Sequence, residues 1–258
     1  MCLLTFSYRS VPDYPLVFAG NRDEFYDRPT APASFWDEAP HVLAGRDRKA
    51  GGTWMGITRN GHWGVVTNVR DPGQYRPDAK SRGTLVADYL RDEPAPESYL
   101  HSVAAEADRY NGFNLLLGTP RSLYYYSTRA GGPRPVEPGL HGLSNDRLDT
   151  PWPKVQRATQ MLERQLAHGG PSPGALLALL DDRRPAPDEA LPDTGLSRER
   201  ERMLSPIFIE GDEYGTRAST VLLVEQDGSV TFVERTFDRG AAGETRSFSF
   251  EVPVPSGV

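Results

Sequence analysis

The chain has 258 residues, of which 38% are hydrophobic and 25% charged, a balance typical of a folded globular protein. The net charge is -6, and nothing in the composition indicates a basic surface of the kind that binds nucleic acid, so we expect no such partner. Cys2 is the only cysteine, which excludes an internal disulfide and argues for a reducing compartment. No apolar run approaches the ~20 residues of a membrane helix, and no signal peptide is evident, so we expect a cytoplasmic protein.

Four pairs of short apolar-rich runs, each pair separated by turn residues, predict antiparallel hairpins. In chain order these runs are 3–8 with 16–19, 54–58 with 63–67, 113–117 with 123–126, and 220–224 with 230–234. The second pair flanks Asn60-Gly61, a strong local hairpin signal. Residues 248–252 have the composition of a last strand.

Apolar residues at helical spacing predict four helices between these hairpins. The expected helices cover 83–91, 97–109, 153–168 and 173–180. The stretch 181–197 is rich in Pro and Asp and is interpreted as a long exposed loop. We find no internal repeat and treat 1–258 as a single domain. Hairpins interleaved with helices predict an α+β fold in which helices cover antiparallel sheets.

The first hairpin brings Cys2 close to a polar run. If its turn spans 11–14, position 10 faces 15 and Cys2 faces about position 23, with an error of a residue or two. The thiol then lies beside Asn21-Arg22-Asp23-Glu24. Strand alternation puts Arg22 and Asp23 on opposite faces, so both can lie beside Cys2 only if the strand ends or bulges there.

Cys2 also follows the initiator Met1, and a residue this small permits removal of Met1. The thiol and a free α-amine would then share one residue. The pKa of an α-amine is about 8, so part of it is a free base at neutral pH and can take the thiol proton. Arg22 would favour the thiolate, Asp23 could orient the ammonium, and asparagine side chains could donate to an oxyanion.

The run Asn21-Arg22-Asp23-Glu24, followed by Arg28-Pro29, resembles the signature of the NRDE family, which is named for those four residues and includes the transport and Golgi organisation protein two. The resemblance extends over most of the chain, and several ordered motifs are far more specific than one tetrapeptide. The further motifs are Ala44-Gly45-Arg46-Asp47, Gly51-Gly52-Thr53-Trp54, Val66-Thr67-Asn68, Asn111-Gly112-Phe113-Asn114, Gly142-Leu143-Ser144-Asn145, Pro206-Ile207-Phe208 and Tyr214-Gly215-Thr216-Arg217.

This family resembles the N-terminal-nucleophile hydrolase superfamily, which implies a four-layer αββα sandwich of two antiparallel sheets. The choloylglycine hydrolase and penicillin V acylase branch has a Cys after Met, an Arg and an Asp near the end of the second strand, one or two Asn, and a late Arg. Those acylases space the Arg and Asp apart, whereas here they are adjacent. The matching positions are Cys2 as nucleophile, Arg22 and Asp23 as its partners, Asn68 and Asn145 as oxyanion or substrate-amine donors, and Arg217 as a late structural or polar partner.

Three further residues are candidates for substrate binding: Asn21, Trp54 and Asn114. The run Gly51-Gly52-Thr53-Trp54 lacks the Lys and helix of a P-loop and is interpreted as a close-packed turn that lines the pocket. The five histidines have no metal-ligand spacing, so we expect no metal site.

Structural interpretations compete with these assignments. Cys2 could be a small buried hydrophobic residue, and Arg22-Asp23-Glu24 a salt-bridged strand end. Asn68 and Asn145 could only cap turns.

The function that we expect is hydrolysis of a linear amide, or of a thioester, through an acyl-Cys2 intermediate without a cofactor. The alternative is a non-catalytic protein that uses the same pocket to bind and traffic haem or acyl-coenzyme A and lipids, as the family's known links imply. Haem would need Cys2 or a histidine as an axial ligand, and the C-x-x-C-H motif is absent. A third hypothesis is that the protein is a catalytically inactive scaffold. The substrate and the oligomeric state stay open.

Overall fold

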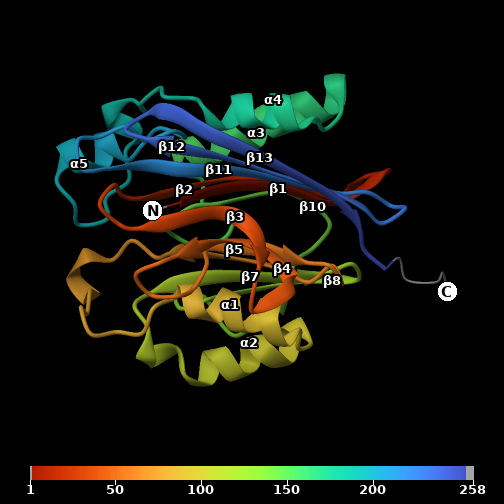
Figure 1. Cartoon of the computed structure of the whole chain (residues 1–258). Coiled ribbons are helices and arrows are strands. Elements are labelled where there is room, and N and C mark those ends of the chain that lie inside the picture. The colour runs from red at the N-terminus through yellow and green to blue at the C-terminus, as the bar shows by residue number, and fades with distance from the viewer. Residues whose placement is uncertain (1, 254–258) are drawn as a thin grey trace.

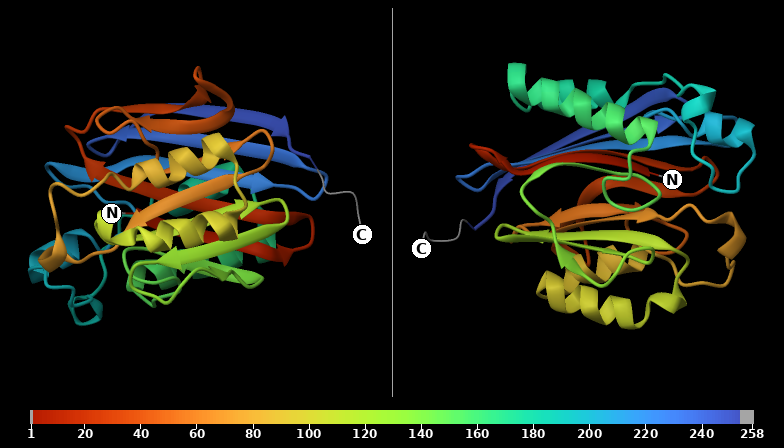
Figure 2. Two further views of the ribbon diagram at one scale, coloured as in Figure 1. Left: turned by 90° about the horizontal axis from the view of Figure 1, so that it is seen from below. Right: turned by 180° about the vertical axis from the view of Figure 1, so that it is seen from behind.

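Two antiparallel sheets lie face to face between two layers of helices in the computed structural model of this chain (Figures 1 and 2). The structure describes residues 2–253, and of Cys2 only the backbone. Helices α3 and α4 cover the outer face of one sheet, and α1 and α2 cover the outer face of the other (Figure 1). The expected α+β fold, a four-layer αββα sandwich, is confirmed.

The first sheet has six strands and holds the start of the chain at its centre. In spatial order they are β10 (Gly139–Leu143), β1 (Cys2–Val11), β2 (Tyr14–Phe25), β11 (Tyr214–Val224), β12 (Ser229–Asp238) and β13 (Ala241–Glu251).

The second sheet has seven strands, which follow one another in chain order. They are β3 (Thr30–Trp36), β4 (Ala39–Asp47), β5 (Met55–Thr58), β6 (Trp63–Asn68), β7 (Phe113–Thr119), β8 (Ser122–Ser127) and β9 (Arg134–Pro135).

The helices connect strands within or between these sheets. They are α1 (Gly83–Asp92), α2 (Pro96–Ala105), α3 (Pro153–Gly169), α4 (Pro173–Leu180) and the short α5 (Arg198–Met203), with 3-10 turns at Pro72–Gln74, Ala107–Arg109 and Asp188–Ala190. Within the described part of the chain, no helix has the length and apolarity needed to cross a membrane.

Strand alternation builds two separate cores from the same strand. In β1, Leu4 and Phe6 point between the sheets, whereas Leu3 packs under α3 and α4. In β2, Phe18 faces the other sheet and Val17 faces the helices. Both faces of these strands are therefore buried. This explains why their sequences are continuous apolar runs and do not alternate between apolar and polar residues.

The four hairpins and the four main helices are confirmed, with longer strands than expected. The first hairpin differs by one residue because a bulge, with Arg9 at φ 48°, lies between Tyr8 and Val11. Cys2 consequently pairs with Arg22, which is within the error stated for position 23.

Strands β3, β4, β9 and β10 and helix α5 were not expected. The interpretation of 181–197 as an exposed loop is wrong in part, because Asp182, Ala186 and Leu191 are buried. The backbone oxygen of Asp182 accepts a hydrogen bond from the N–H of Phe208, which fastens the loop to the sandwich.

Candidate functional site

One end of the sandwich gathers the strand ends that carry most of the candidate residues. Cys2 opens β1 and is the register partner of Arg22 on β2. On the other side of β1, Leu4 pairs with Leu143 of β10, and the same register continued by two residues would bring Asn145 across from Cys2. The backbone of Cys2 therefore lies between Arg22 and the segment that carries Asn145, while its thiol is outside the described residues.

Strand β2 stays extended through Glu24, so Arg22 and Asp23 point to opposite faces of the sheet. The Arg22 guanidinium lies 4.4 Å from the ring centroid of Trp54, on the side of the second sheet. The Asp23 carboxylate accepts a hydrogen bond from Thr216 at 2.7 Å. The end or bulge of β2 that would bring both side chains beside Cys2 is absent, which tells against the joint assignment of Arg22 and Asp23. The register shift lies in the neighbouring β11, at Arg217.

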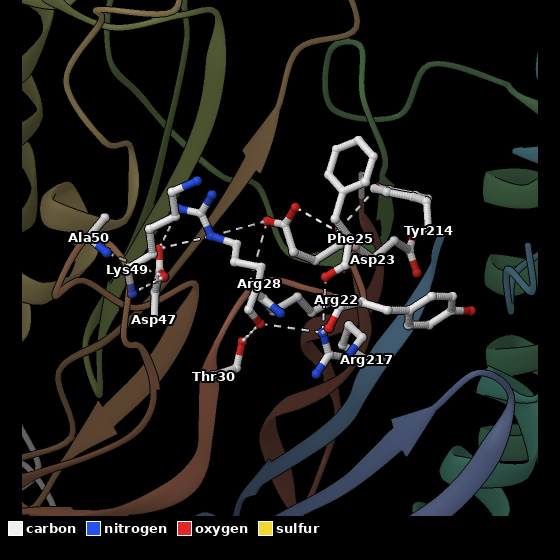
Figure 3. A network of polar contacts seen from close by, with 12 residues as sticks. Arg22, Asp23, Phe25, Arg28, Thr30, Asp47, Lys49, Ala50, Tyr214 and Arg217 are labelled. Atoms are coloured by element: carbon white, nitrogen blue, oxygen red, sulfur yellow. Dashed lines mark hydrogen bonds and ion pairs between the residues drawn. The ribbon is translucent and has the colours of Figure 1, made fainter. Parts of the chain in front are cut away.

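A chain of alternating charges leads from Arg22 to the turn after β4 (Figure 3). Glu24 lies 3.5 Å from Arg22 and 3.7 Å from Arg28, and Arg28 pairs with Asp47 at 2.6 Å. Asp47 also accepts the backbone N–H of Lys49 at 3.0 Å. Burial raises the pKa of Asp47, but these hydrogen bonds outweigh it and hold the pKa below its usual value. Arg28 and Asp47 thus act as a structural support for Arg22.

The position of Trp54 depends on two glycines of the same motifs. A Cβ added at Gly45 would lie 2.2 Å from Cη2 of Trp54, and one at Gly52 would lie 2.4 Å from the backbone of Gly83. Both contacts leave no room for a side chain. The two glycines therefore leave room for the indole of Trp54 at the place where Arg22 stacks on it. This agrees with the interpretation of Gly51-Gly52-Thr53-Trp54 as a close-packed turn.

Asp23 lies in a buried polar cluster on the helix side of the sheet. Its carboxylate is 3% exposed, and its backbone oxygen accepts the hydroxyl of Tyr214 at 3.0 Å. Burial raises the pKa of Asp23, and the positive charge of Lys154 is the strongest opposing influence. Lys154 is itself buried in α3 and donates to the backbone oxygen of Leu204 at 3.0 Å.

A buried ion pair belongs to the same cluster. Arg70, just after β6, pairs with Glu201 of α5, and both side chains are at most 4% exposed. The Arg70 guanidinium lies 4.7 Å from the ring centroid of Trp152. Burial lowers the pKa of Arg70, whereas Glu201 and Asp23 oppose that shift. We refer to Asp23, Lys154, Arg70 and Glu201 as the Asp23 cluster.

Asn68 and Asn145 lie together because the ends of β6 and β10 are joined. The side-chain amide nitrogen of Asn145 donates to the backbone oxygen of Asn68 at 2.8 Å. The backbone N–H of Arg70 donates to the backbone oxygen of Asn145 at 2.7 Å. The hydroxyl of Thr67 donates a hydrogen bond to the backbone oxygen of Ser144 at 2.8 Å. The side chain of Asn145 is fully buried, so its orientation is fixed.

The amide of Asn21 is engaged by the protein. It donates to the backbone oxygens of Leu180 and Ile207, both at 2.9 Å, and accepts from Ser219 at 2.6 Å. These bonds tie β2 to the end of α4.

Asn114 is engaged in the same way on the other sheet. Its amide donates to Thr67 and to the backbone of Asp146, and it accepts the hydroxyl of Tyr125 at 2.8 Å. Asn21 and Asn114 thus use their amides in hydrogen bonds within the protein.

Arg217 fastens the connection between β2 and β3. Its Nη1 donates to the backbone oxygens of Phe25 and Tyr26, both at 2.9 Å. This position matches the structural alternative that the resemblance offered for Arg217.

A cavity of about 450 Å³ opens beside Arg22, between β3 and the strands β11 and β12. Its lining includes Arg22, Trp54, Pro32, Phe237 and Glu234. We call it the β3–β12 cavity. Trp54 is thus part of the wall of this cavity.

Sequence reasoning missed Lys154, Arg70, Glu201 and Glu234. One signal was available for Lys154, since it occupies the apolar stripe of α3 four residues before the buried Ala158. Arg70 and Glu201 lie 131 residues apart and carry no local signal.

Within residues 3–253 no group of three or more His, Asp or Glu side chains could hold a metal ion. No histidine lines the β3–β12 cavity, and His141 uses both ring nitrogens on Asp149 and on the backbone of Glu137.

Comparison with known proteins gives a consistent family match. The family model described as Transport and Golgi organisation 2 matches residues 1–239. The Transport and Golgi organization 2 homolog of Mus musculus is 36% identical over 97% of this chain and 99% of its own length. The Homo sapiens homolog is 37% identical over the same shares of the two chains. Among solved structures, the Caenorhabditis elegans ortholog of N-acylethanolamine-hydrolyzing acid amidase has a TM-score of 0.49 at 12% identity, covering 86% of this chain and 92% of that one.

Proposed function

Since this chain belongs to the Transport and Golgi organisation 2 family, we propose that it hydrolyses a linear amide, or a thioester, with the Cys2 thiol as nucleophile. One observation carries the proposal. The backbone of Cys2 is the register partner of Arg22, at the end of the sandwich where Asp23, Asn68 and Asn145 also lie. A thiol beside a fixed guanidinium is favoured as a thiolate, the reactive form.

In the proposed reaction Met1 has been removed and the free α-amine of Cys2 takes the thiol proton. The sulfur forms a bond to the substrate carbonyl carbon, and the C–N bond of the amide then breaks. The α-ammonium returns the proton to the departing amine. Water, deprotonated by the same amine, attacks the acyl-Cys2 carbonyl, and the carboxylic acid and the thiol are released.

Arg22 and Asp23 have separate tasks in this proposal, which their opposite faces support. The positive charge of Arg22 stabilises the thiolate. Asp23, whose charge Lys154 supports, orients the α-ammonium, which belongs to the backbone of residue 2 and lies in the plane of the sheet. No bulge in β2 is needed for this division.

Asn145 is the proposed oxyanion donor. One of its amide hydrogens holds the backbone oxygen of Asn68, and we assign the other to the oxygen of the tetrahedral intermediate. Loss of one such donor lowers kcat by about 100-fold or more in other enzymes.

The first test is the intact mass of the native protein together with turnover by Cys2→Ala. We expect a mass without Met1 and acyl-amide or acyl-thioester hydrolysis that Cys2→Ala abolishes without a change in circular dichroism. Cys2→Ser should keep a little activity, because a hydroxyl can use the same base. Retained Met1 in most molecules would remove the free-amine mechanism.

Haem titration on the same samples separates the enzyme from a carrier. A saturable Soret shift or tight acyl-coenzyme A binding that Cys2→Ala leaves unchanged, without Cys2-dependent turnover, would replace the hydrolase with the binding function.

A further inference from the structure

We propose that the β3–β12 cavity holds the acyl part of the substrate and that the Glu234 carboxylate selects acyl groups whose far end carries an amine. This inference rests on the proposed function, because it takes Cys2 as the reacting residue.

The cavity begins at the register partner of Cys2 and crosses the sheet. Cys2 pairs with Arg22, Arg22 with Ala218, and Ala218 with Thr236, and the last three of these residues line the cavity. Three strand spacings separate β1 from β12, about 14 Å in all. A volume of about 450 Å³ lies within the range of small-molecule sites. The cavity therefore has the length and size for a chain attached at residue 2.

The walls of the cavity suit an aliphatic chain. Trp54, Pro32, Ala31 and Phe237 supply apolar surface along it. Burial of each methylene against such surface stabilises a ligand by about 0.8 kcal/mol. The walls alone would accept any acyl chain of this length, so selectivity has to come from the polar groups.

Glu234 is the most buried of the polar residues that β12 contributes to the lining, and the fold holds it in place. It is 2% exposed, and its Oε1 accepts the backbone N–H of Ala33 at 2.6 Å. A register shift in β3 between Ala31 and Ser34 leaves the backbone groups of Ala33 to bond outside their own sheet. The oxygen of Ala33 accepts from Arg246 at 3.1 Å, so the same residue is held from both sides.

A carboxylate buried beside apolar side chains gains from a cationic ligand. The charged groups around Glu234 are Arg22 from β2 and Arg246 and Glu244 from β13. Arg246 pairs with Glu244 at 2.9 Å, and Arg22 lies 3.5 Å from Glu24.

The two other charged residues of the lining are Arg217 and Asp238. The Nη1 of Arg217 is engaged by backbone oxygens, and Arg217 lies on β11. The two acidic residues of the lining, Glu234 and Asp238, both lie on β12, whereas the two arginines lie on β2 and β11. The β12 side of the cavity is therefore negative, and an ammonium group complements it.

The test compares three p-nitroanilides that differ only at the far end: aminocaproyl, caproyl and adipoyl. We expect wild type to prefer the aminocaproyl probe, measured as kcat/KM. Glu234→Gln should lower kcat/KM for that probe by about tenfold to 100-fold, the worth of a hydrogen bond to a charged group. The readout is the ratio of the aminocaproyl to the caproyl kcat/KM, which cancels any effect of the variant that does not depend on the amine. Burial raises the pKa of Glu234 to about 7, so the aminocaproyl preference should increase as the pH rises through that value and disappear in Glu234→Gln.

Glu244→Gln is the matched control, since it removes one negative charge from the exposed side of Arg246. It should leave the preference unchanged. Glu234→Asp keeps the charge and should keep part of the preference, which guards against a fold defect in Glu234→Gln. Equal turnover of aminocaproyl and caproyl probes, or a preference for adipoyl, would overturn the inference.

Calorimetry with aminocaproamide on Cys2→Ala separates this inference from the proposed function. Binding that Glu234→Gln abolishes, without turnover of any probe by wild type, would support the pocket and contradict the hydrolase. Turnover without an effect of Glu234→Gln would support the hydrolase and contradict the selection. Neither binding nor turnover would overturn both.

Discussion

Glu234 keeps an ionisable group between the two sheets, and the stability of the fold should depend on its charge. Burial raises its pKa from 4.5 to about 7, with Ala33, Arg22 and Arg246 opposing the shift. Between those values the unfolded chain loses a proton that the folded chain retains. The free energy of unfolding therefore decreases as pH rises through this window, and below it the contribution is absent.

Glu234→Gln should accordingly stabilise the protein at high pH. A raised pKa of this size corresponds to about 3 kcal/mol at most, and a weaker bond from Ala33 to a neutral amide reduces the gain to about 2 kcal/mol. Urea unfolding at pH 8 and at pH 4 measures the effect, with a gain expected only at pH 8. Equal differences at both pH values would show that the charge is not the cause. A residue that costs stability in this way is typical of a binding position.

At the scale of elements, hydrogen bonds between Asp149 and β10 close the loop that carries Asn145. Asp149 adopts φ 63° and accepts the backbone N–H of Gly142 at 2.9 Å and His141 Nδ1 at 2.8 Å. Burial lowers the pKa of His141, but Asp149 and the oxygen of Glu137 outweigh it and raise the pKa above 6.5. Both ring nitrogens face acceptors, so the protonated ring is favoured.

Asp149→Asn should lower the pKa of His141, observed by NMR titration of the ring. A raised folded pKa gives stability that is complete below the unfolded pKa and is lost as pH rises through the folded one. The variant should therefore lose more stability at pH 6 than at pH 8, by about 1 kcal/mol. His168→Gln, at the exposed end of α3, is the control and should show no such difference. The opposite pH trend would exclude an Asp149–imidazolium bond.

The hairpins could be predicted from the sequence because each is a local pattern of apolar runs and turn residues, as around Asn60-Gly61. Strand β10 could not, since it is ordered by pairing with β1, more than 130 residues away. Strand β3 is an edge strand that contains a proline and whose register shifts twice, so neither alternation nor a turn marks it. Its shape follows from contacts with β12.

The site was predicted to a similar degree. Local register was enough to place Cys2 by Arg22, with an error of one residue from the bulge at Arg9. The Asp23 cluster and Glu234 depend on contacts between layers, which no local pattern records.

At the scale of the whole molecule, the Arg70–Glu201 pair connects the end of β6 with α5 and, through Trp152, with the start of α3. Glu201→Gln leaves a buried guanidinium without its charged partner, and the expected loss is about 3–5 kcal/mol of unfolding free energy. Urea denaturation measures it. The double variant Arg70→Met with Glu201→Leu should recover part of this loss, because apolar groups of similar size need no partner.

Asp188→Asn is the control, since it breaks an exposed pair with Arg202 on the same helix α5. Its effect should lie within the error of the measurement. An equal loss in Asp188→Asn and Glu201→Gln would show that α5 docking, rather than burial of the charge, determines the result.

The order of strands in the six-stranded sheet has a consequence for synthesis on the ribosome. Strand β2 pairs with β11, so the hairpin made first waits for residues 214–224, near the end of the chain, whereas all seven strands of the other sheet lie within 30–135. We expect the second sheet to form while the nascent chain is still short. Until β11 emerges, one edge of β2 offers unpaired backbone groups to other chains. Pairing over such a long separation is slow, so this interval is when the protein would depend most on chaperones.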